Sequence, residues 1–271
     1  MTQRIAFIGG GNMASAVIGG LIKQGMAPSE IDVVEPFADA RDHLRSRFGL
    51  QPQAAAGAFL SQCALVIWAV KPQAFKDAAL AVAPHIASAL HLSVAAGIRS
   101  DSIARWLGTE RVVRAMPNTP ALIGKGISGL FARPAVTTAD KHWVEQVMAT
   151  TGEVLWFDAE EKLDAVTALS GSGPAYVFYF MEAMTTAGTE MGLTREQSHQ
   201  LTVATFVGAS ELARTSSEPP KILRQRVTSK GGTTHAAIAS MEDGDLQAEF
   251  INAIYAARQR AQTLGDEFRA A

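Results

Sequence analysis

A glycine-rich turn near the N-terminus has the residue types and spacing needed to bind a pyrophosphate. Gly9, Gly11 and Ala14 form a G-x-G-x-x-A pattern directly after an apolar run and at the start of a helical stretch. Glycines permit a tight turn and close approach to the backbone, and the free amides at the helix start face negative charge. The pattern predicts a dinucleotide site at the first strand–helix junction.

An acidic residue, Glu35, closes the second predicted strand about 20 residues after Ala14, the offset typical of the dinucleotide fingerprint. A carboxylate there would accept hydrogen bonds from the adenosine ribose hydroxyls and repel a 2′-phosphate, which favours NAD over NADP. The alternative is a solvated charge at a strand end. Arg41, in the following helix, could still reach a phosphate, so both NADH and NADPH stay open as cofactors.

Two more strand ends lie at the same edge of the predicted sheet, where ligands of such sheets bind. In Ala69-Val70-Lys71-Pro72, proline can begin the next helix, and Lys71 can supply a cation near the phosphates or the nicotinamide. An exposed loop lysine is an equally good interpretation of Lys71. In Ala95-Ala96-Gly97, small side chains leave room for a flat ring.

A second glycine-rich turn lies late in the chain, between two helix-like segments. It contains Ser229, Gly232, Thr233 and Thr234, so that several backbone amides and hydroxyls can point at one spot. The following helix begins with exposed N–H groups, and such a turn suits a small carboxylate. The alternative is a helix connection that binds nothing.

Short apolar runs alternate with helical stretches through the first half of the chain. This order predicts an α/β fold, a Rossmann-type doubly wound parallel sheet covered on both faces. The predicted strands are Ile5 to Ile8, Ile31 to Glu35, Leu65 to Val70, Leu92 to Ala95, Arg111 to Ala115, Ile127 to Ala132 and Glu153 to Phe157. The predicted helices are Met13 to Gln24, Ala38 to Phe48, Phe75 to Val82, Ser100 to Leu107 and one from Thr138.

After Asp158 the strand pattern disappears and helical spacing replaces it. Helices are predicted from Pro174 to Met191, from Thr194, where Gln197 completes a capping box, and over a last segment from Leu246 to Leu264. We therefore expect a dinucleotide-binding domain over residues 1–158 and an all-helical domain over residues 159–271.

The helix after Gly173 is apolar on more than one face, because Tyr176, Phe178 and Tyr179 accompany its apolar stripe. A helix that is apolar all round must be buried. Either the first domain or a second copy of the chain covers it. We favour the second copy, because so few helices cannot surround one another.

The composition excludes several classes of partner. The formal net charge of −2 is unlike that of a nucleic-acid binder, and the longest apolar runs are too short for a membrane span of about 20 residues. The single cysteine, Cys63, sits among apolar neighbours and is expected in the core. With no targeting segment visible at Met1 and no metal-ligand cluster, we expect a cytoplasmic protein without a metal.

Five motifs together resemble the pyrroline-5-carboxylate reductase family, in its order and spacing over essentially the whole chain. The last two are the most specific, because many dehydrogenases share the first. The motifs are Gly9-Gly10-Gly11-Asn12-Met13-Ala14, Ala69-Val70-Lys71-Pro72, Met116-Pro117-Asn118-Thr119-Pro120, Ser170-Gly171-Ser172-Gly173-Pro174-Ala175-Tyr176 and Thr228-Ser229-Lys230-Gly231-Gly232-Thr233-Thr234.

The resemblance implies reduction of 1-pyrroline-5-carboxylate to L-proline, the last step of proline biosynthesis, with NADPH or NADH. It also implies a homodimer that interlocks through the helical domain, within a larger ring of dimers in many members. On the substrate it places Glu160, Ser229, Gly232, Thr233 and Thr234. On the cofactor it places Ile8, Gly9, Gly10, Gly11, Asn12, Met13, Glu35, Ala69, Val70, Lys71, Pro72, Ala95, Ala96 and Gly97.

Three residues depart from the family pattern. Lys230 stands where proline is common and can add a cation near the carboxylate. Arg226 stands where some members carry a ligand-contacting asparagine, so that role is not transferred. Glu35 replaces the small or hydroxyl residue of NADPH-preferring members.

Hydride transfer to a protonated imine needs mainly the alignment of donor and acceptor, which fits the absence of a catalytic triad pattern. Thr234 is the candidate for the hydroxyl that bonds the ring nitrogen. His235 is interpreted as structural, and Asn118 as a turn residue that bonds its own backbone.

Two other functions are alternatives to the reductase. A hydroxyacid dehydrogenase would need a general base, commonly a lysine, on the helix after Gly173, and that helix offers Glu182 but no lysine. A non-catalytic dinucleotide sensor would have no need of a carboxylate-binding turn.

Overall fold

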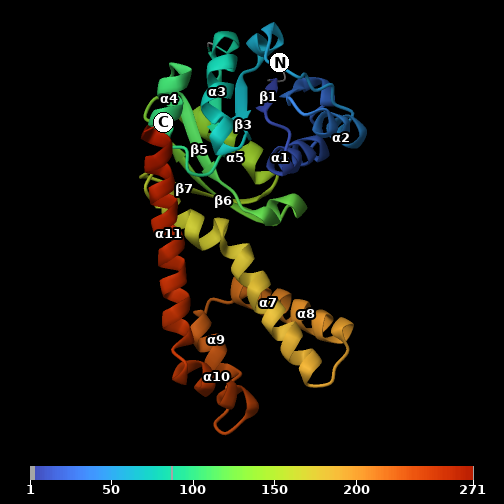
Figure 1. Cartoon of the computed structure of the whole chain (residues 1–271), viewed down its shortest axis with the longest axis vertical. Helices are drawn as coiled ribbons and strands as arrows, with labels where there is room; N and C mark the ends of the chain where they lie inside the picture. The colour runs from blue at the N-terminus through green and yellow to red at the C-terminus, as the bar shows by residue number, and fades with distance from the viewer. Residues whose placement is uncertain (1–3, 87, 271) are drawn as a thin grey trace. The chain divides into compact units, whose positions relative to one another are not determined.

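A computed structural model describes residues 4–86 and 88–270 of the chain (Figure 1). The chain forms two compact units. The first contains the residues through Ser172 together with the stretch from Ala257 onward, and the second is Gly173–Ala256. These units follow packing, whereas the predicted division after residue 158 concerns function and stays a prediction.

The first unit is built around a seven-stranded sheet in the order β2-β1-β3-β4-β5-β6-β7. All neighbouring strands run parallel except β5 and β6, which are antiparallel. The predicted α/β class is confirmed, and the last two predicted strands, Ile127 to Ala132 and Glu153 to Phe157, belong to the same sheet as β6 and β7. The strands are β1 Ile5–Ile8, β2 Ile31–Val34, β3 Leu65–Trp68, β4 Leu90–Ser93, β5 Val112–Met116, β6 Gly126–Ala132 and β7 Gly152–Phe157.

Both faces of the sheet are buried because successive strand side chains point to opposite faces. Ile5 and Phe7 belong to one apolar cluster, and Ala6 and Ile8 belong to the other. Residues of α1, α2 and α5 pack in the first cluster, and residues of α3 and α4 pack in the second. The helices of this unit are α1 Asn12–Lys23, α2 Ala38–Phe48, α3 Pro72–Val82, α4 Ser100–Leu107, α5 Thr138–Ala149 and the short α6 Lys162–Val166.

The ends of two strands differ from the predictions by two residues. The fourth strand is Leu90–Ser93, two residues earlier than predicted, because His91 and Leu92 pair with Val112 and Val113 of β5. The third strand stops at Trp68 rather than Val70. Ala69 to Pro72 and Ala95 to Gly97 therefore lie beyond strand ends, free of the sheet ladder.

Short turns of 3-10 or π helix fill several connections, and Asn118 stabilises one of them. Its Oδ1 accepts a hydrogen bond from the Ile127 N–H at 3.0 Å. The prediction that the Asn118 side chain bonds its own local backbone is therefore wrong. The side chain instead connects η4 to β6. These turns are η1 Pro28–Glu30, η2 Ala58–Gln62, η3 Ala83–His85, η4 Thr119–Ile123 and the π turn η5 Thr167–Gly171.

Cys63 lies in the core, as predicted. Its Sγ donates a hydrogen bond to Asp32 Oδ2 at 3.4 Å, and burial, followed by the charge of Asp32, raises the pKa of the thiol to about 12. A thiol with that pKa stays protonated at neutral pH and is a poor nucleophile.

The second unit is helical. The capping box at Thr194 is confirmed, since Thr194 Oγ1 accepts from the Gln197 N–H and the Gln197 side chain accepts from the Thr194 N–H. None of the helices in the described part of the chain is both long and apolar enough to span a membrane. The helices are α7 Gly173–Glu190, α8 Arg195–Thr215, α9 Pro220–Arg226, α10 Thr233–Asp243 and the first part of α11 Leu246–Ala270.

Candidate active site

The loops after β1 and β3 meet at the point where the strand order reverses, which is where open α/β sheets bind ligands. Gly9 has a φ of +94°, and a Cβ there would lie 2.6 Å from the Ala69 carbonyl oxygen. Both the backbone conformation and the neighbouring loop therefore require glycine. The structure thus brings two of the predicted cofactor segments into contact.

The first helix begins beside this contact without a side-chain cap. Its N-cap, Gly11, has no capping hydrogen bond, and a Cβ added to Gly11 would meet nothing within 4 Å. Asn12, the first helical residue, is exposed. Uncapped amides facing open space fit the pyrophosphate of a dinucleotide, which such helix ends bind through N–H groups and the helix dipole.

Glu35 lies against the same glycine loop. Its Oε2 accepts a hydrogen bond from the Gly10 N–H at 2.7 Å, and its Oε1 accepts from the Phe37 N–H at 2.9 Å. The side chain packs so closely that a Cβ on Gly10 would meet Leu44 and Glu35. The carboxylate thus stabilises the conformation of the glycine turn through the Gly10 N–H.

The other two predicted segments also end strands of this sheet. Lys71 is exposed as the N-cap of α3, and Pro72 occupies the first helical position, as predicted. Gly97 has a φ of +75°, and a Cβ there would contact Leu264 and the Phe268 ring. The end of α11, within the first unit, therefore lies directly on the Ala95 to Gly97 loop.

Glu160 joins several elements of the first unit. Its Oε1 accepts from Arg114 Nη1 at 2.6 Å and from the Ser100 N–H at 2.7 Å, and its Oε2 accepts from the Ser100 hydroxyl. Arg114 is buried on β5, and Ser100 begins α4. Both carboxylate oxygens are engaged, so Glu160 fixes the start of α4 next to the predicted nicotinamide loop.

A second ion pair supports the same region. Arg99 Nη2 lies 3.5 Å from the Asp164 carboxylate and 3.9 Å from that of Asp266 on α11. Burial raises the pKa of Asp164, although the charge of Arg99 opposes the rise. These contacts attach the end of α11 to the loop that follows Gly97.

The late turn lies in the second unit and has a defined geometry. The Gly232 N–H donates to the Ser229 carbonyl at 3.0 Å, and Gly231 has a φ of +75°, so Lys230 and Gly231 are the central residues of a tight turn. Gly232 is the N-cap of α10 and has no side-chain cap. The N–H groups of Thr233, Thr234 and the next residue therefore lie at an open helix start.

Sequence reasoning missed three residues that shape the site: Ser100, Arg114 and Phe268. Arg114 was the detectable one, because a charge inside the apolar strand Val112–Met116 must have a buried partner. No local pattern in the sequence shows that Ser100 donates hydrogen bonds to Glu160. None shows that Phe268 packs against Gly97.

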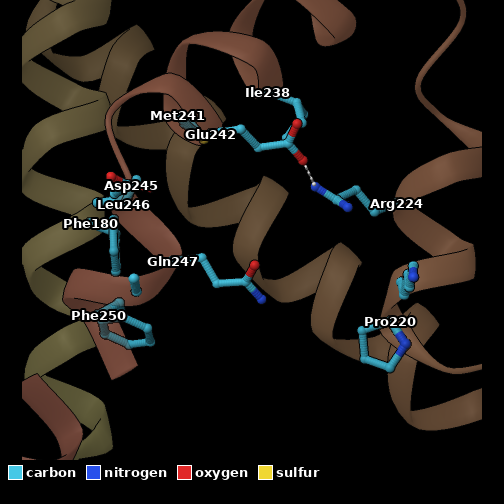
Figure 2. A pocket seen from close by; sticks show the side chains of 12 residues that line it. Phe180, Pro220, Arg224, Ile238, Met241, Glu242, Asp245, Leu246, Gln247 and Phe250 are labelled. Atoms are coloured by element: carbon cyan, nitrogen blue, oxygen red, sulfur yellow. Dashed lines mark hydrogen bonds and ion pairs between the residues drawn. The ribbon is translucent and has the colours of Figure 1, made fainter. Parts of the chain in front are cut away.

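The second unit also contains a cavity of about 840 Å³, shown in Figure 2. It lies among α7, α9, α10 and the start of α11, with Phe180 beside Phe250 and an Arg224–Glu242 ion pair of 3.0 Å across it. Of the predicted site residues that the structure describes, none lines this cavity. We therefore attach no substrate role to it.

Comparison with known proteins gives concordant matches. The family described as "Pyrroline-5-carboxylate reductase dimerisation" matches residues 160–264, and that described as "NADP oxidoreductase coenzyme F420-dependent" matches residues 4–97. The pyrroline-5-carboxylate reductase of Pseudomonas aeruginosa is 44% identical over 268 residues, 98% of this chain and 98% of that protein. The Arabidopsis thaliana enzyme of the same name is 34% identical, over 96% of this chain and 95% of that protein.

Solved structures agree with the sequence matches. The pyrroline-5-carboxylate reductase from Coxiella burnetii has a TM-score of 0.90 and 38% identity, over 97% of this chain and 99% of that chain. The Plasmodium falciparum pyrroline carboxylate reductase, solved with NADP bound, has a TM-score of 0.87 and 28% identity, over 97% of this chain and 98% of that chain.

Proposed function

This chain belongs to the pyrroline-5-carboxylate reductase family, and we propose that its uncapped α1 start and its Ser229 to Thr234 turn hold the two reactants. The enzyme reduces 1-pyrroline-5-carboxylate to L-proline, the last step of proline biosynthesis, with NADPH or NADH. The observation that carries the residue assignment is the open start of α1 behind a glycine turn that no other residue type fits.

The first unit supplies the groups for cofactor binding in this proposal. Amides of residues 12–14 bind the pyrophosphate, with the loop from Ile8 to Met13 and the Ala69 to Pro72 segment around it. The small Ala95 to Gly97 segment leaves space for the nicotinamide, which supplies the hydride when bound. Lys71, exposed at the start of α3, provides a cation at this edge.

The late turn supplies the groups for substrate binding. The open N–H groups at the start of α10 bind the substrate carboxylate, helped by Ser229, Gly232 and Thr233. Thr234 bonds the ring nitrogen through its hydroxyl and so orients the imine carbon. Alignment of this kind can supply about 7 kcal/mol or more of the barrier reduction, so no further reactive side chain is required.

Glu160 takes part as a positioning residue in this proposal. With both oxygens bound to Ser100 and Arg114, its carboxylate is held in place and keeps α4 and the Gly97 loop fixed. It would thus affect the proposed nicotinamide site through the loop that it supports.

Oligomerisation is expected from the family match over residues 160–264. We propose a homodimer through the helical region, with dimers assembled into a larger ring as the family resemblance implies. Its support is the exposed apolar surface of α7, where Phe178 and Tyr179 are 57% and 71% exposed. The functional division at residues 158 and 159 and a cytoplasmic location complete the proposal.

The test measures oxidation of the reduced cofactor with 1-pyrroline-5-carboxylate as substrate, separately with NADH and NADPH. In Thr234→Ala we expect kcat/KM to fall by about 100-fold, the lower end of what a lost transition-state hydrogen bond costs. Thr205→Ala is the matched control, because Thr205 lies on an exposed face of α8 and bonds only its own helix at Leu201. Equal kinetics in the two variants would remove Thr234 from the site.

The same assay separates the two alternatives. A dinucleotide sensor would bind cofactor without any oxidation dependent on the imine, and a hydroxyacid dehydrogenase would turn over a hydroxy acid instead. The α7 helix, Gly173–Glu190, carries no lysine that could serve such a dehydrogenase as a general base.

A further inference from the structure

Two residues beyond the end of β2, Glu35 and Arg41 of α2, can decide which nucleotide this enzyme prefers. NADP carries a phosphate on the adenosine 2′-oxygen where NAD carries a hydroxyl. In sheets of this type, a carboxylate at this place selects the hydroxyl, and a nearby arginine accommodates the phosphate. The sequence contains both residues, so the choice depends on which of them is available to a ligand.

Glu35 is committed to the backbone. Only 6% of its surface is exposed, and each carboxylate oxygen accepts one backbone N–H, from Gly10 and from Phe37. Turning the carboxylate toward a ribose would leave the buried Gly10 N–H without a partner, which costs about 1–3 kcal/mol. Glu35 therefore shapes the glycine turn, and a ribose hydroxyl could bind it only by sharing an oxygen that already accepts a backbone N–H.

Arg41 is also bound to the backbone, but as a donor to two carbonyl groups. Its Nη1 donates to the Glu35 carbonyl at 2.9 Å and to the Pro36 carbonyl at 2.6 Å. Among the described residues, the hydrogen bonds of this guanidinium run through Nη1. A guanidinium has five N–H donors, so the edge formed by Nη2 and Nε retains three, in the planar arrangement that binds phosphate through two bonds.

The other arginines of α2 are engaged elsewhere. Arg45 pairs with Asp42, and the guanidinium of Arg47 lies 5.0 Å from the centre of the Phe48 ring. The first turn of α2 also carries Asp39, an exposed acid that a phosphate would meet. A phosphate bound at this strand end therefore depends on the cation of Arg41.

We propose that Arg41 binds the 2′-phosphate of NADPH, that Glu35 positions the glycine turn without contacting the ribose, and that the enzyme consequently prefers NADPH to NADH. This reverses the preference for NAD expected from a carboxylate at the end of β2. The inference rests on the proposed role of the first unit in dinucleotide binding.

The test is isothermal titration of the full-length protein with NADP⁺ and NAD⁺, and with adenosine 2′,5′-bisphosphate and AMP as fragments. In Arg41→Ala we expect the Kd for NADP⁺ and for the bisphosphate to rise by about 10-fold or more, the effect of losing charged hydrogen bonds. The Kd for NAD⁺ and for AMP should change by less than about 3-fold. Arg41→Lys keeps the charge but not the two-bond geometry, so its Kd for NADP⁺ should lie between those of the wild type and Arg41→Ala.

Two further variants complete the design. Arg45→Ala is the matched control on the same helix and should leave all four affinities unchanged. Glu35→Gln should weaken NADP⁺ and NAD⁺ by the same factor, since a residue that shapes the turn affects the shared pyrophosphate. Thermal unfolding of each variant shows that it is folded.

The outcomes distinguish the role of Arg41 from the existence of the cofactor site. If wild-type protein binds neither dinucleotide, the proposed cofactor site itself is wrong. If it binds both but Arg41→Ala leaves the NADP⁺ to NAD⁺ ratio unchanged, only the role of Arg41 is lost. A Glu35→Gln variant that loses NAD⁺ alone would restore Glu35 as the ribose ligand and overturn the proposal.

Discussion

At the scale of single residues, His91 shows how the core constrains a titratable group. It lies on β4, is 1% exposed, and its Nδ1 accepts a hydrogen bond from Trp68 Nε1 at 3.2 Å. Burial, followed by the charge of Arg111, lowers the pKa of His91 from its ordinary 6.5 to about 4. The folded protein therefore keeps this imidazole neutral at a pH where the unfolded chain protonates it.

His91 should make the fold sensitive to mild acid. Because the pKa is lower in the folded state, its stabilising effect is complete above pH 6.5 and is lost as the pH falls toward 4. The loss is on the order of 3 kcal/mol in total, with about 2 kcal/mol of it reached by pH 5. Urea unfolding at pH 7 and pH 5 measures it.

His91→Gln, which keeps an acceptor for Trp68, should reduce this pH dependence of the unfolding free energy. His142→Gln is the control, because His142 is exposed on α5. Wild type and His91→Gln losing the same free energy between the two pH values would contradict the interpretation.

At the scale of elements, the end of α11 acts as part of the first unit. Leu264 and Phe268 lie against Gly97, and Arg269 pairs with Asp101 of α4 at 3.0 Å. A helix that begins in one compact unit thus ends on the loop proposed to border the nicotinamide. Its role could not be inferred from its own spacing, because the periodic pattern does not identify the surface on which a helix packs.

Phe268→Ala should loosen this loop. We expect the unfolding free energy to fall by about 2 kcal/mol, below the cost for a fully buried phenylalanine because Phe268 is half-buried. The KM for the dinucleotide should rise more than kcat falls. The control is Glu267→Ala, whose exposed ion pair with Arg260 contributes little.

Denaturant unfolding and steady-state kinetics with varied cofactor provide the measurements. A Phe268→Ala variant with wild-type KM for the dinucleotide would show that α11 only stabilises the fold at this point.

At the scale of the whole molecule, the apolar surface of the second unit is the main feature that one chain does not explain. Phe178, Tyr179, Met184 and Leu201 are all large, apolar and exposed. Exposed large apolar side chains gathered on two neighbouring helices are typical of protein interfaces. The proposed homodimer would bury these side chains.

Tyr179→Glu should weaken self-association, since removing a central aromatic residue of an interface costs about 2 kcal/mol or more. Sedimentation velocity over a range of protein concentrations measures the shift toward monomer. Leu80→Glu on α3 is the control, because Leu80 is 54% exposed but lies in the first unit. Identical sedimentation of both variants and wild type would argue against this face.

The candidate site was only partly predictable. The glycine turn could be located because Gly9, Gly11 and Ala14 occupy fixed offsets from a strand, and offsets are local. The hydrogen-bond partners of Glu35 and Glu160 could not be predicted, because Gly10 and Ser100 approach these carboxylates only after distant segments have folded together. The charge of Arg114 within an apolar strand indicates that it has a buried acidic partner, but the sequence does not show that this partner is Glu160.

The sequence alone determined what local spacing controls: the strand and helix order of the first half, the capping box at Thr194, and the motifs that resemble a reductase family. Tertiary structure alone decided which polar groups remain available to a ligand. Burial fixed Glu35 on backbone amides, and two carbonyls held Arg41 at the same strand end. A side chain's type follows from the sequence, but its free hydrogen-bonding capacity depends on neighbours that only folding brings together.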